Sequence, residues 1–97
     1  MNKDEILLGK KVLITAKLIR KEKHIKGGTY SKYWEKKMIP STDGVIAGLR
    51  NLSNGEAWWE QDVGRLYDPK EFFTAAIVYT HLWRKPLYVK LEDMEEI

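Results

Sequence analysis

The sequence predicts an all-β protein, a small antiparallel barrel of about five or six short strands with short helical turns at the termini. Apolar and polar side chains alternate over residues 10–20, which is the period of a half-buried strand. Short β-favouring runs follow at spacings of about 8 to 15 residues, separated by turn residues, as in small barrels. Closing the sheet would protect strand edges that otherwise invite aggregation.

After this first strand the chain is expected to form a long basic hairpin. Gly27-Gly28 marks the tip, and residues 30–40 form the returning strand. Neither face of that strand is cleanly apolar, so we expect a basic ribbon at about residues 20–39 to protrude from the barrel. Pro40 cannot donate a ladder hydrogen bond, and residues 40–44 are therefore predicted to be a turn.

The strongest local signal is Asn54-Gly55, the dipeptide that best tolerates a type I′ turn, which predicts a central hairpin. In the register that this turn sets, Arg50 opposes Trp59 and places a guanidinium beside an indole. Only one of Trp58 and Trp59 then points inward, and the sequence does not decide which. Gly48 is a candidate bulge that would switch the two faces.

The C-terminal half is predicted to contain three further strands. A short strand around residues 65–67 precedes a turn at Asp68-Pro69, and residues 70–73 are expected to form a helical turn. Residues 72–83 are almost continuously apolar, with β-branched and aromatic side chains that favour a buried strand. Residues 87–91 alternate as a final strand.

Length and composition indicate one globular domain spanning residues 1–97. The chain has no cysteine, which excludes disulfides and thiolate metal sites. No apolar run approaches the roughly 18 residues of a membrane span, so we expect a cytoplasmic protein without membrane association. Helical turns are expected in the polar lead, residues 1–9, and in the acidic tail, residues 92–97.

No catalytic arrangement is visible in the sequence. His24 and His81, the two histidines, have no further ligand at metal-binding spacing, and we interpret both as structural or solvated residues. The paired carboxylates at Glu60 and Asp62 lie near a turn rather than in a recognisable cleft motif. We therefore expect a protein that is not an enzyme and that needs no cofactor.

Charge is distributed unevenly, and cations interleave with aromatic residues in the basic ribbon. Residues 10–37 hold nine Lys and one Arg against two Glu, whereas residues 51–97 hold five Lys or Arg against nine Asp or Glu. Cations can track phosphates while aromatic faces stack bases, although a β-ribbon also uses aromatic pairs for stability and lysines for solubility. The candidate binding residues, for protein or nucleic acid, are Lys26, Tyr30, Lys32, Tyr33, Trp34, Lys36, Lys37, Arg50 and Trp59.

Several motifs resemble known small barrels. A strand beginning Lys11-Val12, the stretch Gly44-Val45-Ile46-Ala47-Gly48 and the closing Tyr88-Val89-Lys90-Leu91-Glu92-Asp93-Met94-Glu95 look like the SH3-like β-barrels. The chain also resembles small uncharacterised barrel proteins encoded by bacteriophages, in residues 48–55 and 84–89. The resemblance implies a binding module and supplies no catalytic residues.

These observations give three hypotheses. The first is a non-enzymatic phage-type module that acts by protein–protein interaction in the host cytoplasm, one form of which is inhibition of a host defence complex. The second is a nucleic-acid-binding protein that uses the basic ribbon. The third is sequestration of a small nucleotide signal between two protomers, and the sequence also allows a symmetric homodimer.

Overall fold

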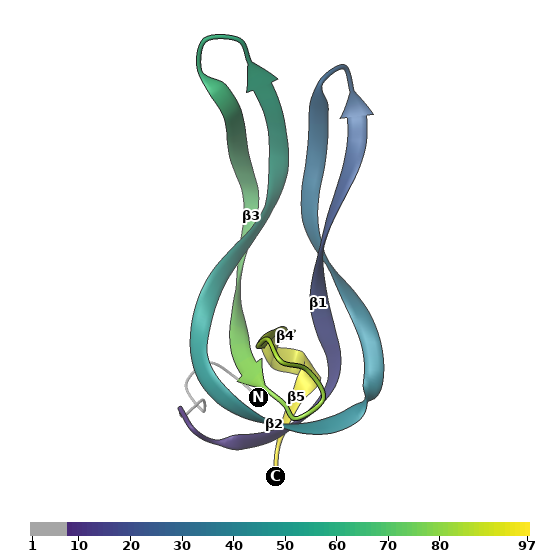
Figure 1. The fold of residues 1–97 in the computed structure, drawn as a ribbon, viewed down its shortest axis with the longest axis vertical. Coiled ribbons are helices and arrows are strands. Elements are labelled where there is room, and N and C mark those ends of the chain that lie inside the picture. Colours follow the sequence, from purple (N-terminus) through teal and green to yellow (C-terminus); the bar gives the residue numbers. More distant parts are fainter. Residues whose placement is uncertain (1–7) are drawn as a thin grey trace.

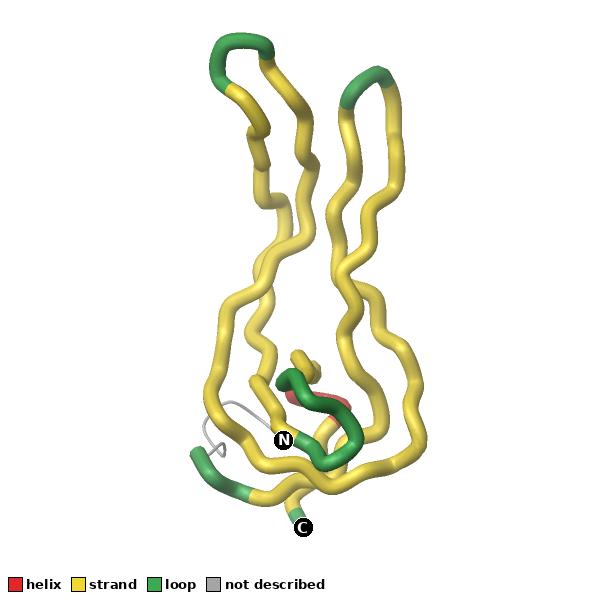
Figure 2. The backbone as a smooth tube through the Cα atoms, viewed as in Figure 1, coloured by secondary structure: helices red, strands yellow, loops and turns green. Residues whose placement is uncertain are grey.

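A computed structural model describes residues 8–97 as one antiparallel sheet of five strands (Figures 1 and 2). The elements are β1 (Lys11–Lys26), β2 (Thr29–Glu60), β3 (Gly64–Tyr79), β4 (Leu87–Lys90), the 3₁₀ turn η2 (Leu91–Asp93) and β5 (Met94–Glu96). Their order in the sheet is β4-β3-β2-β1-β5. The prediction of an all-β antiparallel protein is thus confirmed. The expected N-terminal helical turn falls largely on residues 1–7, outside the described residues. The turn expected in the acidic tail is confirmed only at its start, where η2 lies, because the following residues form the strand β5.

The shape is a fork, with two long hairpins that rise in the same direction from a common base (Figure 1). The described chain measures 49 Å along its long axis and 26 by 21 Å across it. We call residues 20–34 the basic arm, because five Lys or Arg stand there against one Glu. We call residues 54–71 the acidic arm, because five Asp or Glu stand there against two Lys or Arg. The strand β2 runs down the first arm, through the base and up the second (Figure 2).

The sheet does not close into a barrel. At the base β1 and β4 lie against each other, but no ladder of hydrogen bonds joins them, and β4 and β5 are the two edges. The structure therefore shows the antiparallel sheet and leaves the SH3-like barrel without support. The C-terminal strand β5 pairs with β1 through Val12, Leu13 and Ile14, which covers only the first part of that edge.

Two apolar clusters hold the base together. The larger consists of Val12, Ile14, Ile46, Ala76, Val78, Val89 and Met94, with Ile39, Leu87 and Leu91 packed against it. Alternate residues of β1 face this core, as the period of residues 10–20 predicts. The smaller cluster, Leu18, Leu52 and Ala75, lies where the arms leave the base, with Trp34, Phe73 and Tyr88 around it. Full burial of one such aliphatic side chain stabilises the fold by about 1.5–3 kcal/mol.

The predicted turn at Asn54-Gly55 is wrong, because both residues lie inside β2. Asn54 pairs with Glu71 and Gly55 with Pro69, while the chain reverses only at residues 61–63. A Cβ on Gly55 would press on the carbonyl oxygen of Asp68 and lie 2.9 Å from Pro69 Cα. A glycine is therefore needed here because β3 approaches closely. It is not needed for a positive φ, since Gly55 has none.

The register that followed from this turn is wrong as well. Arg50 pairs with Ala75 and Trp59 with Arg65, so Arg50 and Trp59 are not neighbours. The predicted irregularity at Gly48 is confirmed by a shift in the ladder between Ile46 and Gly48. Burial, however, changes faces further along, between Leu52 and Gly55, where a second shift occurs.

Prolines interrupt fewer strands than expected. The predicted turn at residues 40–44 is part of β2, and the ladder absorbs Pro40 by a shift opposite Ile14 and Ala16. Likewise the turn at Asp68-Pro69 and the helical turn at residues 70–73 are wrong, because both segments belong to β3. A bulge or a free strand edge tolerates the missing proline N–H. The strand predicted at residues 87–91 is confirmed as β4, but it is not the last one, because β5 follows it. The strand expected over residues 72–83 ends at Tyr79.

Candidate binding cleft between the arms

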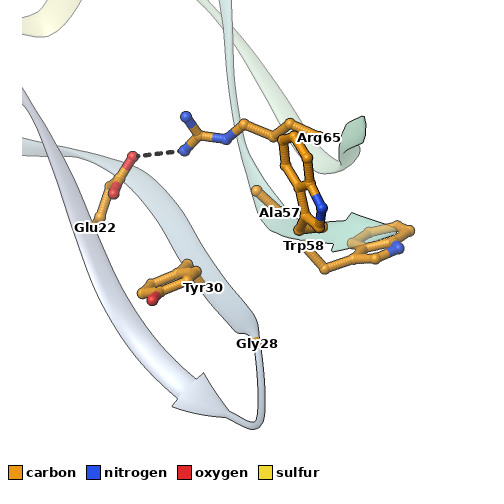
Figure 3. Close-up of a pocket in the computed structure, with 7 residues that line it drawn as sticks. Glu22, Gly28, Tyr30, Ala57, Trp58 and Arg65 are labelled. Atoms are coloured by element: carbon orange, nitrogen blue, oxygen red, sulfur yellow. Dashed lines mark hydrogen bonds and ion pairs between the residues drawn. The ribbon is translucent and has the colours of Figure 1, made fainter. Parts of the chain in front are cut away.

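A cleft of about 380 Å³ lies between the two arms, near their free ends (Figure 3). It is lined by Glu22, Gly28 and Tyr30 of the basic arm and by Ala57, Trp58, Trp59 and Arg65 of the acidic arm. Ligand pockets usually span about 300–1,000 Å³, so this cleft lies at the lower end of that range. We refer to it below as the arm cleft.

One carboxylate links the two walls of the arm cleft. Glu22 Oε1 accepts a hydrogen bond from Lys32 Nζ at 2.9 Å and another from Arg65 Nη2 at 3.1 Å. The hydrogen bond from Lys32, followed by that from Arg65, lowers the pKa of Glu22 below its ordinary value of 4.5. Because Glu22 and Arg65 are largely exposed, the pair between them orients the arms more than it stabilises the fold, whereas the Lys32 side chain is only 14% exposed.

Below the arm cleft, cation–π contacts continue the connection between the arms. The Arg20 guanidinium lies 5.3 Å from the ring centroid of Trp34 and 5.9 Å from that of Tyr67, which belongs to the acidic arm. The Trp34 backbone N–H donates to Asn54 Oδ1 at 2.9 Å. Asn54 therefore joins the two arms instead of turning the chain.

Trp34 forms the floor of this region. Its ring meets Tyr88 edge to face, with centroids 5.3 Å apart, and it packs on the cluster around Leu18 and Leu52. The buried indole Nε1 of Trp34 has no hydrogen-bond partner among the described residues. The residue thus contributes packing rather than a polar contact for a ligand.

Large apolar side chains are exposed around the arm cleft and at both tips. Trp59 is 71% exposed, Val63 65%, Ile25 51% and Tyr30 41%. Trp58 is half-buried, and its indole N–H donates to Glu60 Oε1 at 3.2 Å. Of the two tryptophans that the sequence left undecided, Trp59 is therefore the more exposed one.

The predicted binding residues do not form one patch. Tyr30 and Trp59 line the arm cleft, Lys32 adjoins it through Glu22, and Lys26 lies at the tip of the basic arm. Tyr33 and Lys37 lie on the opposite face of the strand from Tyr30, Lys32, Trp34 and Lys36, because neighbouring residues of a strand alternate. Arg50 lies further toward the base, where it donates to the Tyr88 hydroxyl.

Two predicted cations are already paired within the molecule. Lys36 Nζ lies 2.9 Å from Asp93 Oδ1 and 3.2 Å from Glu92 Oε1, and these hydrogen bonds raise its pKa above the ordinary value of 10.5. Lys32 is paired with Glu22. Neither ammonium is therefore as available to a phosphate as the sequence suggested.

Sequence reasoning missed Glu22, Trp58 and Arg65 as lining residues. Glu22 and Arg65 are 43 positions apart, and no local pattern links them. The misplaced turn also assigned Arg65 to a separate short strand, although it pairs directly with Trp59. The β-favouring run at residues 65–67 was a usable signal, since it could have served as the partner of residues 57–59.

The two histidines lie at opposite ends of the described molecule: His24 is near the tip of the basic arm, and His81 lines a second pocket at the base together with Asp43 and Lys11. His24 Nε2 contacts the Gly27 carbonyl oxygen, and its ring meets the Tyr30 ring at 5.2 Å, so it braces the tip of the basic arm. No group of three or more His, Asp and Glu side chains within residues 8–97 is placed to hold a metal ion. Among the described residues, no helix is long and apolar enough to cross a membrane.

The structure is a forked antiparallel β-protein with a cleft between its arms that is lined partly by aromatic side chains. No protein-family model, curated protein or solved structure matches the chain.

Proposed function

We propose that this protein is a non-enzymatic binding module that acts by protein–protein contact, with the arm cleft and the two tips as its contact surface. The observation that carries the proposal is the exposure of Trp59 and Tyr30, which line the arm cleft, together with that of Val63 and Ile25 at the tips of the two arms. Trp, Tyr and Arg are the side chains that most often anchor protein interfaces. Apolar groups gathered in this way mark a contact site more often than scattered ones do.

The arrangement of the arm cleft favours a protruding partner segment over a flat surface. Its volume of about 380 Å³ accepts one or two side chains, while the tips on either side add apolar contacts beyond the cleft. Each arm is a two-stranded ribbon, and near its tip no third strand pairs with it. The backbone N–H and C=O groups along its edges can therefore form hydrogen bonds with an extended peptide. The partner is thus a protein that inserts an apolar or aromatic side chain, carried on an exposed loop or strand, into the arm cleft.

The experiment is affinity capture with the purified protein, followed by reconstitution with the isolated partner. Trp59→Ala is expected to weaken binding at least tenfold, because interface anchors of this type usually contribute more than about 1.4 kcal/mol. Leu82→Ala is the matched control, since Leu82 is also exposed but lies in the turn at the base. Equal binding by the wild type and Trp59→Ala would contradict the proposal.

The nature of the partner rests on the sequence. The resemblance to phage-encoded barrel proteins supports a role in the host cytoplasm, with a host or phage complex as the target and inhibition of a defence complex as one outcome. Expression in a host that carries such a complex tests this: the wild type should block its activity, and Trp59→Ala should not. If the wild type and Trp59→Ala both blocked the complex, the inhibition would not depend on the arm cleft.

A further inference from the structure

The outer face of the hairpin formed by β1 and β2 carries a stripe of lysines. Lys17 pairs directly with Lys37 in the ladder, Ile19 with Glu35, Lys21 with Tyr33 and Lys23 with Ser31. Directly paired residues project on the same face, so these side chains share the face opposite Leu18, Arg20 and Glu22. We call Lys17, Lys21, Lys23 and Lys37 the lysine stripe. It is separate from the arm cleft, which the other face lines.

The lysine stripe is poorly neutralised by the protein itself. Lys17 and Lys37 are like charges at directly opposed positions, an arrangement that disfavours the sheet in the absence of an anion. Within residues 8–97 neither of them, nor Lys23, forms an ion pair. Lys21 has one long contact, 3.6 Å to Glu35, between two half-exposed side chains. By contrast, Lys32 on the inner face is held at 2.9 Å by its carboxylate.

Aromatic rings lie among these cations. The Lys17 ammonium lies 4.7 Å from the ring centroid of Trp83, which fixes its position at the base of the stripe. Tyr33, half-buried, is the ladder partner of Lys21 in the middle. From Lys17 to Lys23 the strand extends about 20 Å at roughly 3.3 Å per residue. Cations along an extended track with a stacking ring between them are the elements of a single-stranded nucleic-acid site.

We infer that the lysine stripe binds the phosphate backbone of single-stranded nucleic acid, with Tyr33 stacking on a base. The stripe differs from the basic patch that the sequence suggested, because Lys32 and Lys36 are paired and Lys17 and Lys23 take their place. This binding goes beyond the proposed protein contact and uses the opposite face of the basic arm. The protein would then hold nucleic acid on one face and a protein segment in the arm cleft.

The test is fluorescence anisotropy with a labelled single-stranded oligothymidylate of about 15 nucleotides, measured between 50 and 200 mM salt. Three or four phosphate contacts predict a log–log salt slope of about −2 to −3, at roughly −0.7 per contact. Lys17→Gln with Lys37→Gln should reduce the slope to about −1 and weaken binding at the lower salt concentration. Tyr33→Leu should weaken binding about fivefold or more, with little change in slope.

Matched controls separate the stripe from net charge and from the arm cleft. Lys70→Gln with Lys85→Gln removes the same charge outside the hairpin of β1 and β2, and Trp59→Ala alters only the arm cleft. Both should bind the oligonucleotide like the wild type. Removing the opposed pair Lys17 and Lys37 should leave the melting temperature unchanged or higher, which excludes unfolding as the cause of any loss.

Three results would overturn the inference. They are no binding of the oligonucleotide at 50 mM salt, an equal loss in the control variant, and tighter binding of a duplex of the same length. The proposed function does not depend on the outcome, because Trp59→Ala is tested on the partner protein and the stripe variants are tested on the oligonucleotide.

Discussion

The substitution Gly55→Ala adds a single methyl group and thereby tests whether β2 continues past residue 55 as a strand. At Gly55 an added Cβ would meet three groups of β3: the Asp68 carbonyl oxygen, Pro69 Cα at 2.9 Å and the Tyr67 hydroxyl at 2.9 Å. Two of these are backbone atoms, which cannot rotate aside as a flexible side chain can. Overpacking of this kind costs about 1–3 kcal/mol, and we expect the upper half of that range.

The assay is equilibrium unfolding in urea, followed by tryptophan fluorescence, together with thermal melting. Each kcal/mol lowers the melting temperature of a domain of this size by about 4–8 °C, so the expected cost of about 2–3 kcal/mol for Gly55→Ala should lower it by about 8–24 °C. The larger Gly55→Asn should cost more than Gly55→Ala, because the clash grows with the side chain.

Gly27 supplies the matched control. It has φ +60° and open space around its Cβ position, so substitution there costs only backbone strain. At Gly27 the order should reverse: Asn, which tolerates this left-handed conformation, should cost less than Ala. If Asn were also better than Ala at position 55, Asn54-Gly55 would be a turn and the placement of β2 would be refuted.

Three further predictions concern packing and ion pairs, two at the junction of the arms and one between β2 and the C-terminal tail. Trp34→Ala should destabilise the protein by about 3 kcal/mol in urea unfolding, the lower end of the range for core aromatics, since the half-buried ring packs on Leu18 and Leu52. The exposed Trp59→Ala should change stability by less than about 0.5 kcal/mol, and equal effects would contradict this packing of Trp34. The lowered pKa of Glu22 means that its contribution to stability is complete above pH 4.5 and is lost as the pH falls through the lower folded value. In Glu22→Gln the melting temperature should therefore depend less on pH in this acidic range than it does in the wild type. The raised pKa of Lys36 acts in the opposite sense, because its contribution to stability is complete below pH 10.5 and is lost as the pH rises through the higher folded value. Lys36→Gln should therefore remove the fall in melting temperature at alkaline pH. If the fall persisted in the variant, the prediction would be wrong.

The features predicted correctly from the sequence are those that local periodicity determines. Alternation over residues 10–20 requires only that one face of a strand be buried, and Val12 to Leu18 bury that face. Gly27-Gly28 forms a hairpin tip because a glycine with positive φ is needed there. Apolar and polar side chains also alternate over residues 87–91, and β4 forms at Leu87–Lys90.

The errors arise where one residue type serves two physical purposes. Asn54-Gly55 has the composition of a turn, but here Gly55 admits the backbone of β3 and the Asn54 side chain accepts the Trp34 N–H. Pro40 and Pro69 also resemble strand ends, yet register shifts near both allow the ladder to continue. Single-residue preferences cannot reveal this, since it depends on the partner strand.

The candidate sites required the register as well. The sequence identified Tyr30 and Trp59, which line the arm cleft, but grouped them with Tyr33 and Lys37, which lie on the other face. Which lysines remain free depends on carboxylates distant in the sequence, such as Asp93 beside Lys36. Long-range ion pairing thus decides how much of a basic ribbon can meet an anion.

The most direct test of the forked fold is a set of nuclear Overhauser contacts in the isotope-labelled protein. Our account predicts cross-strand backbone contacts between Trp58 and Leu66 and between Trp59 and Arg65, together with ring contacts between Trp34 and Tyr88. Contacts between Asn51 and Trp58 would instead require a turn at Asn54-Gly55. That result would remove the acidic arm, and with it the arm cleft.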